Sequence, residues 1–298
     1  MVGASLTGAL RPAPDYNTRM KLHFTKMHGA GNDFVVIDAT RKPFAPTPAL
    51  LHRLSDRRFG VGCDQILVVE PPTTPDVDFN YRIFNADGGE VGQCGNGSRA
   101  LARFVRERGL TDKSLIRVRT QTSVLELQHV AGDQYRVNMG VPRFEPAEIP
   151  FKAAAREARY QLRLDDGEAV VFGAASMGNP HAVIAVTDVD LARVHELGAS
   201  LQRHLAFPRS VNVGFLQVLD RGHVRLRVYE RGVGETLACG SGACAAVAVG
   251  RVWNQLDARV EVEVRGGQLV IEWNGDNEPV LMTGPAATVF EGEMEWPN

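Results

Sequence analysis

The sequence predicts an α+β protein of two pseudo-symmetric domains, each a curved, mostly antiparallel sheet around a central helix, with the active site in the cleft between them. The chain of 298 residues exceeds the usual size of one domain. A segment around Cys94 (residues 90–97, EVGQCGNG) returns 145 residues later around Cys239 (235–242, ETLACGSG). Each half also holds many short strand-like segments and few helical ones, which is typical of an α+β unit.

The repeat extends beyond the two cysteine segments. Its further matches are residues 81–85 with 226–230, 32–37 with 179–184, and 65–68 with 212–215. The period is as long as a domain, unlike the few dozen residues of a solenoid repeat. A pseudo-twofold axis would therefore relate the halves and place Cys94 opposite Cys239.

In the first half two helices are expected between the strands. The first begins at Thr47 as N-cap with Pro48 in the first helical position, and the second follows Cys94 and is closed by Gly109. The strands are expected at residues 22–26, 34–37, 65–69, 79–84, 116–120, 124–128 and 135–139.

The second half repeats this order after a connection at residues 144–156. One helix is expected near 191–205, and the helix after Cys239 has almost no polar face at 243–249, so it should be buried all round. The strands are expected at residues 170–175, 182–186, 213–219, 224–229, 260–264 and 269–273.

Composition excludes several classes of partner. A net charge of −2 without blocks of like charge does not suggest nucleic-acid or membrane binding. No stretch has the apolar run of a signal peptide or a membrane span. The four cysteines, Cys63, Cys94, Cys239 and Cys244, match neither a disulfide framework nor a zinc motif. We expect a cytoplasmic protein with reduced thiols, no metal, and a small-molecule target.

Each repeated cysteine precedes Gly-x-Gly and an apolar helical segment, so each should stand at a helix N-terminus. There the helix dipole and free N–H groups lower the pKa of a thiol and can hold a carboxylate. Two opposed thiols can invert a carbon: one thiolate removes a proton while the other thiol delivers one to the opposite face. This predicts racemisation or epimerisation of a carbon acid beside a carboxylate, and an α-amino acid fits.

Other interpretations of the cysteines are less favoured. Cys63 and Cys244 are expected to be buried apolar residues. A structural disulfide between Cys94 and Cys239 would close off the polar loops around them, and two thiols without a pair of histidines make an incomplete zinc site.

The repeat is broken where such chemistry needs asymmetry. Phe34 is matched by His181, and Asn85 by Glu230, so His181 and Glu230 could set which sulfur is ionised. A satisfied loop histidine and a solvated glutamate explain them equally well. Amides at equivalent positions suggest a polar pocket, although each alone is typical of turns: Asn32, Gln65, Asn85, Asn179 and Asn212. Arg231 could bind a second carboxylate of the substrate.

Long motifs in this sequence resemble those of the diaminopimelate epimerase family. They are residues 26–34 (KMHGAGNDF), 85–88 (NADG), 93–97 (QCGNG), 177–181 (MGNPH), 229–236 (YERGVGET) and 238–243 (ACGSGA). The resemblance covers about residues 21–292 and implies a two-base interconversion of LL- and meso-2,6-diaminoheptanedioate without pyridoxal phosphate or another cofactor, a step towards lysine and, in most bacteria, peptidoglycan.

The resemblance also implies roles for residues. Cys94 and Cys239 take the catalytic positions, and His181 and Glu230 the positions that modulate pKa. The substrate contacts would be Asn32, Gln65, Asn85, Asn179, Asn212, Glu230 and Arg231, with the backbone donors of Gly95, Asn96, Gly240 and Ser241. A homodimer is implied as well, with Phe290 standing where some members have a tyrosine implicated in dimerisation.

By the same resemblance, residues 1–20 are a flexible extension outside the family pattern. The N-terminal domain would span 21–138, with 285–298 returning to it, and the C-terminal domain 139–284. Two alternatives remain: another pyridoxal-phosphate-independent racemase of the same fold, such as a proline racemase-like enzyme, and a non-enzymatic carboxylate-binding module. The amides with Arg231 argue against the first, and the second thiol argues against the other.

Overall fold

The computed structural model describes residues 19–92 and 94–297. The expected extension at 1–20 lies outside the described residues except for Arg19 and Met20, which already belong to the first strand. The first half contains β1 (Arg19–Gly29), β2 (Asn32–Asp38), α1 (Pro48–Ser55), β3 (Gln65–Glu70), β4 (Phe79–Asn85), β5 (Glu90–Val91), α2 (Gly95–Glu107), β6 (Leu115–Arg119), β7 (Val124–Ala131) and β8 (Gln134–Asn138).

The second half follows a 3₁₀ helix, η1 (Pro146–Glu148), in the expected connection. It contains β9 (Tyr160–Arg163), β10 (Ala169–Ser176), β11 (Pro180–Ala185), α3 (Val194–Arg203), β12 (Asn212–Val218), β13 (His223–Glu230), β14 (Gly234–Thr236), α4 (Gly240–Val252), β15 (Arg259–Val264), β16 (Gly267–Glu272), β17 (Leu281–Pro285) and β18 (Ala287–Pro297). No helix in the described part of the chain is long and apolar enough to cross a membrane.

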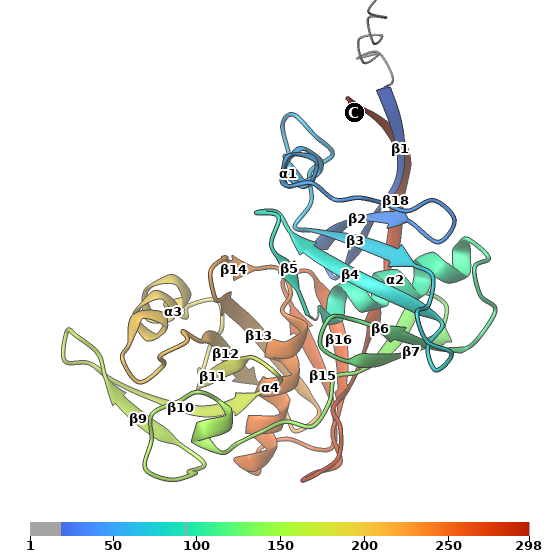
Figure 1. The fold of residues 1–298 in the computed structure, drawn as a ribbon. Coiled ribbons are helices and arrows are strands. Elements are labelled where there is room, and N and C mark those ends of the chain that lie inside the picture. Colours follow the sequence, from blue (N-terminus) through green and yellow to red (C-terminus); the bar gives the residue numbers. More distant parts are fainter. Residues whose placement is uncertain (1–18, 93, 298) are drawn as a thin grey trace, which may run out of the picture.

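The two halves repeat one strand order, as the sequence predicts. β2 runs parallel to β3, and β11 runs parallel to β12. β4 then pairs antiparallel with β3 and parallel with β6, just as β13 does with β12 and β15. Most other neighbours are antiparallel, so the fold is α+β with two similar, mostly antiparallel units, which form separate lobes in Figure 1.

The strands at the two ends of the chain, β1 and β18, pair with each other and complete the strand order of the first half. β18 pairs antiparallel with β1, from Arg19 opposite Pro297 to His28 opposite Ala287, in the position that β9 takes beside β10. β8 and β17 pair with each other and join the halves into one sheet. We propose domain limits at this junction: residues up to 138 together with 285–297 form one domain, and 139–284 form the other.

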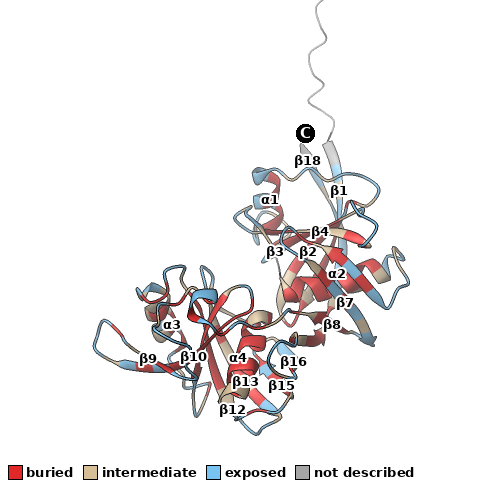
Figure 2. Ribbon diagram, turned by 60° about the horizontal axis from the view of Figure 1, so that its bottom comes forward, coloured by how far each residue is buried: buried red, intermediate tan, exposed pale blue. Residues whose placement is uncertain are grey.

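A buried helix occupies the centre of each unit. Figure 2 shows α2 and α4 mostly in red, the colour of buried residues. In α4 every residue from Ala243 to Val249 is at most 2% exposed, as its apolar sequence predicts. The caps of the first two helices are also as expected: Thr47 accepts a hydrogen bond from Leu50 N at 3.2 Å, and Gly109 follows α2 with a φ of +63°.

Most strands that the residue pattern missed are short or contain turn residues. β5, β14 and β9 have only two, three and four residues, and β17 contains Gly284 and Pro285. The pattern also missed β18, although Glu291, Glu293 and Glu295 alternate there with Gly292 and Met294. α3 is shorter than the range 191–205 predicted for it, because Leu191 and Leu205 are 82% and 83% exposed and flank the helix.

An arginine–glutamate pair braces the hairpin that leads to each cysteine. Arg82 donates to both carboxylate oxygens of Glu90, at 2.9 and 2.8 Å, and Arg227 donates to both of Glu235, at 2.6 and 2.9 Å. These bidentate pairs fix β4 to β5 and β13 to β14. They explain why a glutamate precedes both cysteines at the same distance.

Candidate active site

Each repeated cysteine is the N-cap of a central helix, as predicted: Cys94 caps α2 and Cys239 caps α4. The Cys94 sulfur accepts a hydrogen bond from Gly97 N at 3.3 Å, and the Cys239 sulfur lies 3.7 Å from Ser241 Oγ. Cys94 is partly exposed and Cys239 is 4% exposed. All four cysteines are free thiols, and Cys63 and Cys244 are buried.

The second glycine of each Gly-x-Gly segment is required by close packing next to the cysteine. A Cβ added at Gly97 would lie 2.6 Å from Tyr81 Oη and 3.4 Å from Cys94 Sγ. A Cβ at the equivalent Gly242 would lie 3.1 Å from Cys239 Sγ. A larger residue would therefore clash with the Tyr81 hydroxyl in the first half and press against the sulfur in the second, which explains a motif that helix formation alone does not need.

The N-termini of α2 and α4 meet around one methionine of β17. A Cβ at Gly95 would lie 2.7 Å from Met282 Cε, and one at Gly240 would lie 3.0 Å from Met282 Sδ. Asn96 Nδ2 also donates to Ala238 O at 3.0 Å. The fold thus brings together two cysteine segments that lie 145 residues apart in the sequence.

The predicted amides of the first half form two groups, Asn32 beside Cys94 and Gln65 together with Asn85. Asn32 Oδ1 lies 3.9 Å from the Cys94 sulfur and accepts from Asn96 Nδ2 at 3.3 Å. Gln65 Nε2 donates to Asn85 Oδ1 at 2.9 Å, while Gln65 Oε1 is buried without a hydrogen-bond partner among the described residues. That carbonyl is available as an acceptor for a ligand.

A cluster of four charges, which the sequence pattern did not reveal, supports Asn32. Asn32 Nδ2 donates to Asp64 at 2.8 Å, and Arg57 bridges Asp64 to Asp33, which also pairs with Lys26. Burial raises the pKa of Asp33, but its bonds to Arg57 and Lys26 outweigh this and hold it well below the usual range. The cluster therefore fixes the Asn32 amide with its oxygen towards Cys94.

A series of side-chain contacts from His181 through Asn179 and Ser241 leads to Cys239. His181 is 1% exposed, and its Nε2 lies 2.9 Å from Asn179 Oδ1. Asn179 Nδ2 donates to Ser241 Oγ at 3.3 Å, and this hydroxyl is the one beside the Cys239 sulfur. Burial, with a smaller effect of Arg231, lowers the pKa of His181 to about 3. The imidazole is therefore neutral at pH 7.

Glu230, the last residue of β13, also lies at this end of the site. It accepts a hydrogen bond from Thr236 Oγ1 at 2.5 Å, and burial raises its pKa. Burial and then the Glu230 charge raise the pKa of Cys239 well above its usual value. Burial also raises the pKa of Cys94 to about 11, although the Gly97 N–H opposes it. The N–H groups at the helix N-termini do lower the pKa of both thiols, as expected, but burial outweighs their effect.

Asn212 and Arg231, two predicted substrate contacts, differ in how far their polar groups are already bonded within the protein. Both polar ends of the Asn212 amide already bind the protein, Nδ2 to Pro180 O at 3.0 Å and Oδ1 to Arg231 N at 2.9 Å. Arg231 is exposed, and its Nη1 donates to Arg209 O at 2.9 Å. It forms no ion pair within residues 19–92 and 94–297, so its guanidinium is free to bind a carboxylate.

We predict a pH dependence of stability that originates from His181. Its pKa is about 3 when folded and about 6.5 when unfolded, so the unfolded chain binds one more proton between these values. The stability that this residue provides is complete above pH 6.5 and falls by ~1.4 kcal/mol per pH unit below it. Urea denaturation of wild type and His181→Gln at pH 7.5, 6.5 and 5.5 should give the steeper loss for wild type. Parallel losses would contradict the prediction.

Comparison with known proteins agrees with this geometry. The sequence profile of the family described as diaminopimelate epimerase matches residues 24–145 and 173–289. The chain is 56% identical over 276 residues to the diaminopimelate epimerase of Chromobacterium violaceum, and 57% identical over 278 residues to that of Azoarcus sp. strain BH72; each match covers 93% of this chain and 100% of the relative.

Solved structures share the fold at much lower identity. A phenazine biosynthesis protein of the PhzF family from Bacillus anthracis matches with a TM-score of 0.65 and 19% identity, over 92% of this chain and 99% of that one. A hydroxyproline epimerase from Agrobacterium vitis matches with a TM-score of 0.69 and 16% identity, over 93% of both chains. These show the fold, whereas the profile and the close relatives show the family. The chain is an isomerase that belongs to the diaminopimelate epimerase family.

Proposed function

We propose that the chain epimerises LL-2,6-diaminoheptanedioate to the meso form by a two-base mechanism that uses Cys94 and Cys239 and no cofactor. The observation that carries this proposal is the meeting of two thiol-capped helix N-termini around Met282. The close relatives named diaminopimelate epimerase supply the substrate.

In this mechanism the reacting carbon lies between the two sulfurs. One thiolate takes the proton from that carbon, and the thiol on the other face gives its own proton to it, so that the carbon inverts and the sulfurs exchange protonation states. The negative charge that develops on the carboxylate needs donors in a site without water. The backbone N–H groups of Gly95 and Asn96, and of Gly240 and Ser241, stand in the first turns of α2 and α4 and are suited to supply them.

We propose that two buried residues near Cys239, Glu230 and His181, set the protonation state of its thiol. Glu230 with its raised pKa is suited to accept the Cys239 proton, and neutral His181 holds Ser241 beside the sulfur through Asn179. Because their pKa values are raised, both thiols would be protonated at neutral pH. A bound substrate ammonium group would favour the thiolate, because an opposite charge nearby lowers a thiol pKa.

We propose that the other predicted site residues bind the distal end of the substrate, which does not react. Arg231 would bind the second carboxylate, and the free Gln65 carbonyl would accept from an ammonium group, with Asn32, Asn85, Asn179 and Asn212 around them. Asn96, His181 and Cys239 are each at most 4% exposed. Substrate entry would therefore require the two lobes to move apart, with the paired strands β8 and β17 as the hinge.

The product would serve lysine and peptidoglycan synthesis, as the family resemblance implies. Two reduced thiols are needed for the reaction, and the cytoplasm keeps thiols reduced. We therefore place the enzyme there.

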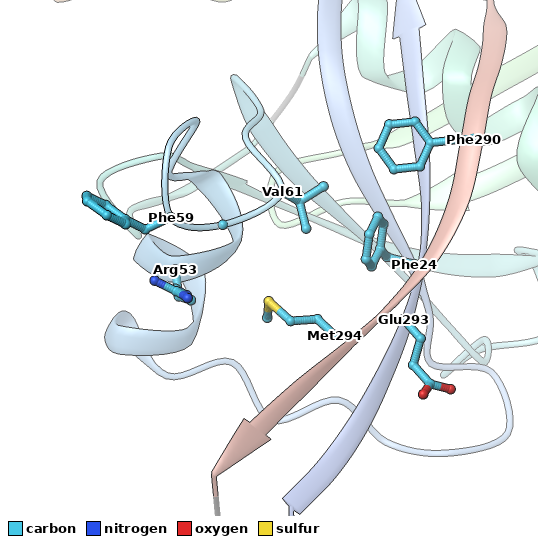
Figure 3. Close-up of a pocket in the computed structure, with 8 residues that line it drawn as sticks. Phe24, Arg53, Phe59, Val61, Phe290, Glu293 and Met294 are labelled. Atoms are coloured by element: carbon cyan, nitrogen blue, oxygen red, sulfur yellow. The ribbon is translucent and has the colours of Figure 1, made fainter.

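We also propose a homodimer formed through β18. Among the described residues β18 pairs only with β1, and it exposes Val289 and Phe290 at 55% and 47%. A long edge strand with exposed apolar residues favours association with a second chain. Phe290 lines a surface hollow of about 360 Å³ together with Phe24, Val61 and Met294. Figure 3 shows these side chains.

The first test replaces the sulfurs. Cys94→Ser and Cys239→Ser should each abolish nearly all epimerisation, because a hydroxyl is a far poorer proton carrier than a thiol near neutral pH. Wild type in D₂O should place solvent deuterium in the product before any enters the remaining substrate. Cys63→Ala, a buried thiol outside the site, is the control. Activity within about tenfold of wild type, a loss of only ~1.4 kcal/mol, in either Ser variant would refute the two-base assignment.

The second test concerns Arg231. Arg231→Lys keeps the charge but loses the planar fork, so it should lower kcat/KM by a factor that corresponds to ~2–5 kcal/mol. An analogue without the distal carboxylate should be a poor substrate for wild type and no worse for the variant. Additive losses from the two truncations would show that Arg231 serves the fold instead.

The third test concerns the dimer. Phe290→Glu puts a charge on the exposed face of β18 and should yield monomers in sedimentation velocity, while a dimeric wild type is expected. Leu205→Glu changes a residue that is 83% exposed on the other lobe and should leave the dimer intact. A dimeric Phe290→Glu protein would place the interface elsewhere.

A further inference from the structure

A buried arginine on α2 has no part in the proton transfers proposed above. Arg99 follows Cys94 by five residues and is 0% exposed. Within the described residues it forms no ion pair, although burying an unpaired guanidinium is costly. Its repeat equivalent, 145 residues later, is Cys244, so only the first half carries this cation.

The structure provides a fitted cradle for the guanidinium. Arg99 Nε donates to Pro285 O at 3.2 Å, Nη2 donates to Asn96 Oδ1 at 3.0 Å, and Nη1 lies 3.4 Å from Met282 Sδ. Glycines of β1 and β17 make the room. A Cβ at Gly29 would lie 3.3 Å from Arg99 Nη2, and one at Gly284 would lie 3.2 Å from Nε.

The contact with Asn96 determines how that amide is oriented. Arg99 has only donors and the Ala238 carbonyl only accepts, so Asn96 Oδ1 must face Arg99 and Nδ2 must face Ala238. Nδ2 lies 3.0 Å from Ala238 O, immediately before Cys239 in the chain. A flipped amide would lose both bonds.

The same chain of bonds reaches the Cys94 sulfur. Asn96 Nδ2 also donates to Asn32 Oδ1 at 3.3 Å, and this oxygen lies 3.9 Å from Cys94 Sγ. Asp64 holds the other end of the Asn32 amide at 2.8 Å. One arginine thus determines hydrogen bonds to both cysteine segments.

We propose that Arg99 is a positioning residue for the epimerisation: through Asn96 it holds the two cysteine segments at one separation. The inference rests on the proposed function. It predicts an effect on kcat more than on KM, because the distance between the sulfurs matters chiefly when the proton is transferred. The Arg99 charge also opposes the high pKa that burial gives the Cys94 thiol.

The test is a double-mutant cycle with Arg99→Met and Asn96→Ala, since alanine keeps the backbone N–H. Each single variant should lower kcat by about thirtyfold or more and change KM by no more than about threefold. The double variant should be no more than about threefold slower than the worse single variant, because the two residues act as one unit. Losses that multiply would overturn the proposal.

Arg103→Met is the matched control. Arg103 lies one turn further along α2 and donates to Ala286 O at 2.6 Å and to Glu107 at 2.7 Å. It ties α2 to the same β17–β18 connection without touching Asn96. The Arg103→Met variant should keep kcat within about threefold of wild type. A loss as large as that of Arg99→Met would show that Arg99 only anchors the helix to this connection.

A second readout separates this inference from a general loss of structure. Alkylation of Cys94 by iodoacetamide, followed by peptide mass spectrometry, should have its midpoint at higher pH in Arg99→Met than in wild type or Arg103→Met; an unchanged midpoint would contradict the placement of the charge. If Arg99→Met fails to fold, Arg99→Lys takes its place in the cycle, because an ammonium cannot make the same set of bonds. Absence of epimerisation in wild type would refute the proposed function, whereas failure of the cycle alone would refute only this inference.

Discussion

Two helix N-termini that meet around one methionine are the constraint on which the rest of the structure depends. Gly95 and Gly240 leave the room that Met282 occupies between them, Gly97 avoids a clash with the Tyr81 hydroxyl, and Gly242 leaves room for the Cys239 sulfur. β17 can bring Met282 to this point only because β8 and β16 hold it on either side. The sheet that joins the two halves is thus what brings the thiols together.

The electrostatics of the site results from a competition between burial and local hydrogen bonds. Burial raises the pKa of both cysteines and lowers that of His181, and the N–H groups at the helix ends recover only part of this effect for the thiols. The pseudo-symmetry is kept in the backbone and broken in charge. The Glu230 charge raises the pKa of both thiols, whereas the Arg99 charge lowers only that of Cys94. A reaction that starts from one thiolate and one thiol needs such a difference.

The sequence predicts the repeat and both cysteine helices because each depends on local signals: caps, glycines and an apolar face. The same is true of His181 and Glu230, which stand out as breaks in the repeat. Arg99, Tyr81 and Met282 could not be found this way, because their importance lies in contacts between segments far apart in the chain. Arg99 is also matched by a different residue, Cys244, in the aligned halves, but α2 carries other arginines and nothing in the sequence shows that this one is buried.

The pairing of β18 with β1 has a consequence for the order of folding. The first lobe needs the last strand of the chain for its sheet, whereas the segment 139–284 forms its own pairings between neighbouring strands. The second lobe therefore does not need the last strand for its own sheet, whereas β1 of the first lobe stays unpaired on one edge until β18 has been made. Contacts between chain ends close slowly. The lobe made first is thus the one whose sheet is completed last.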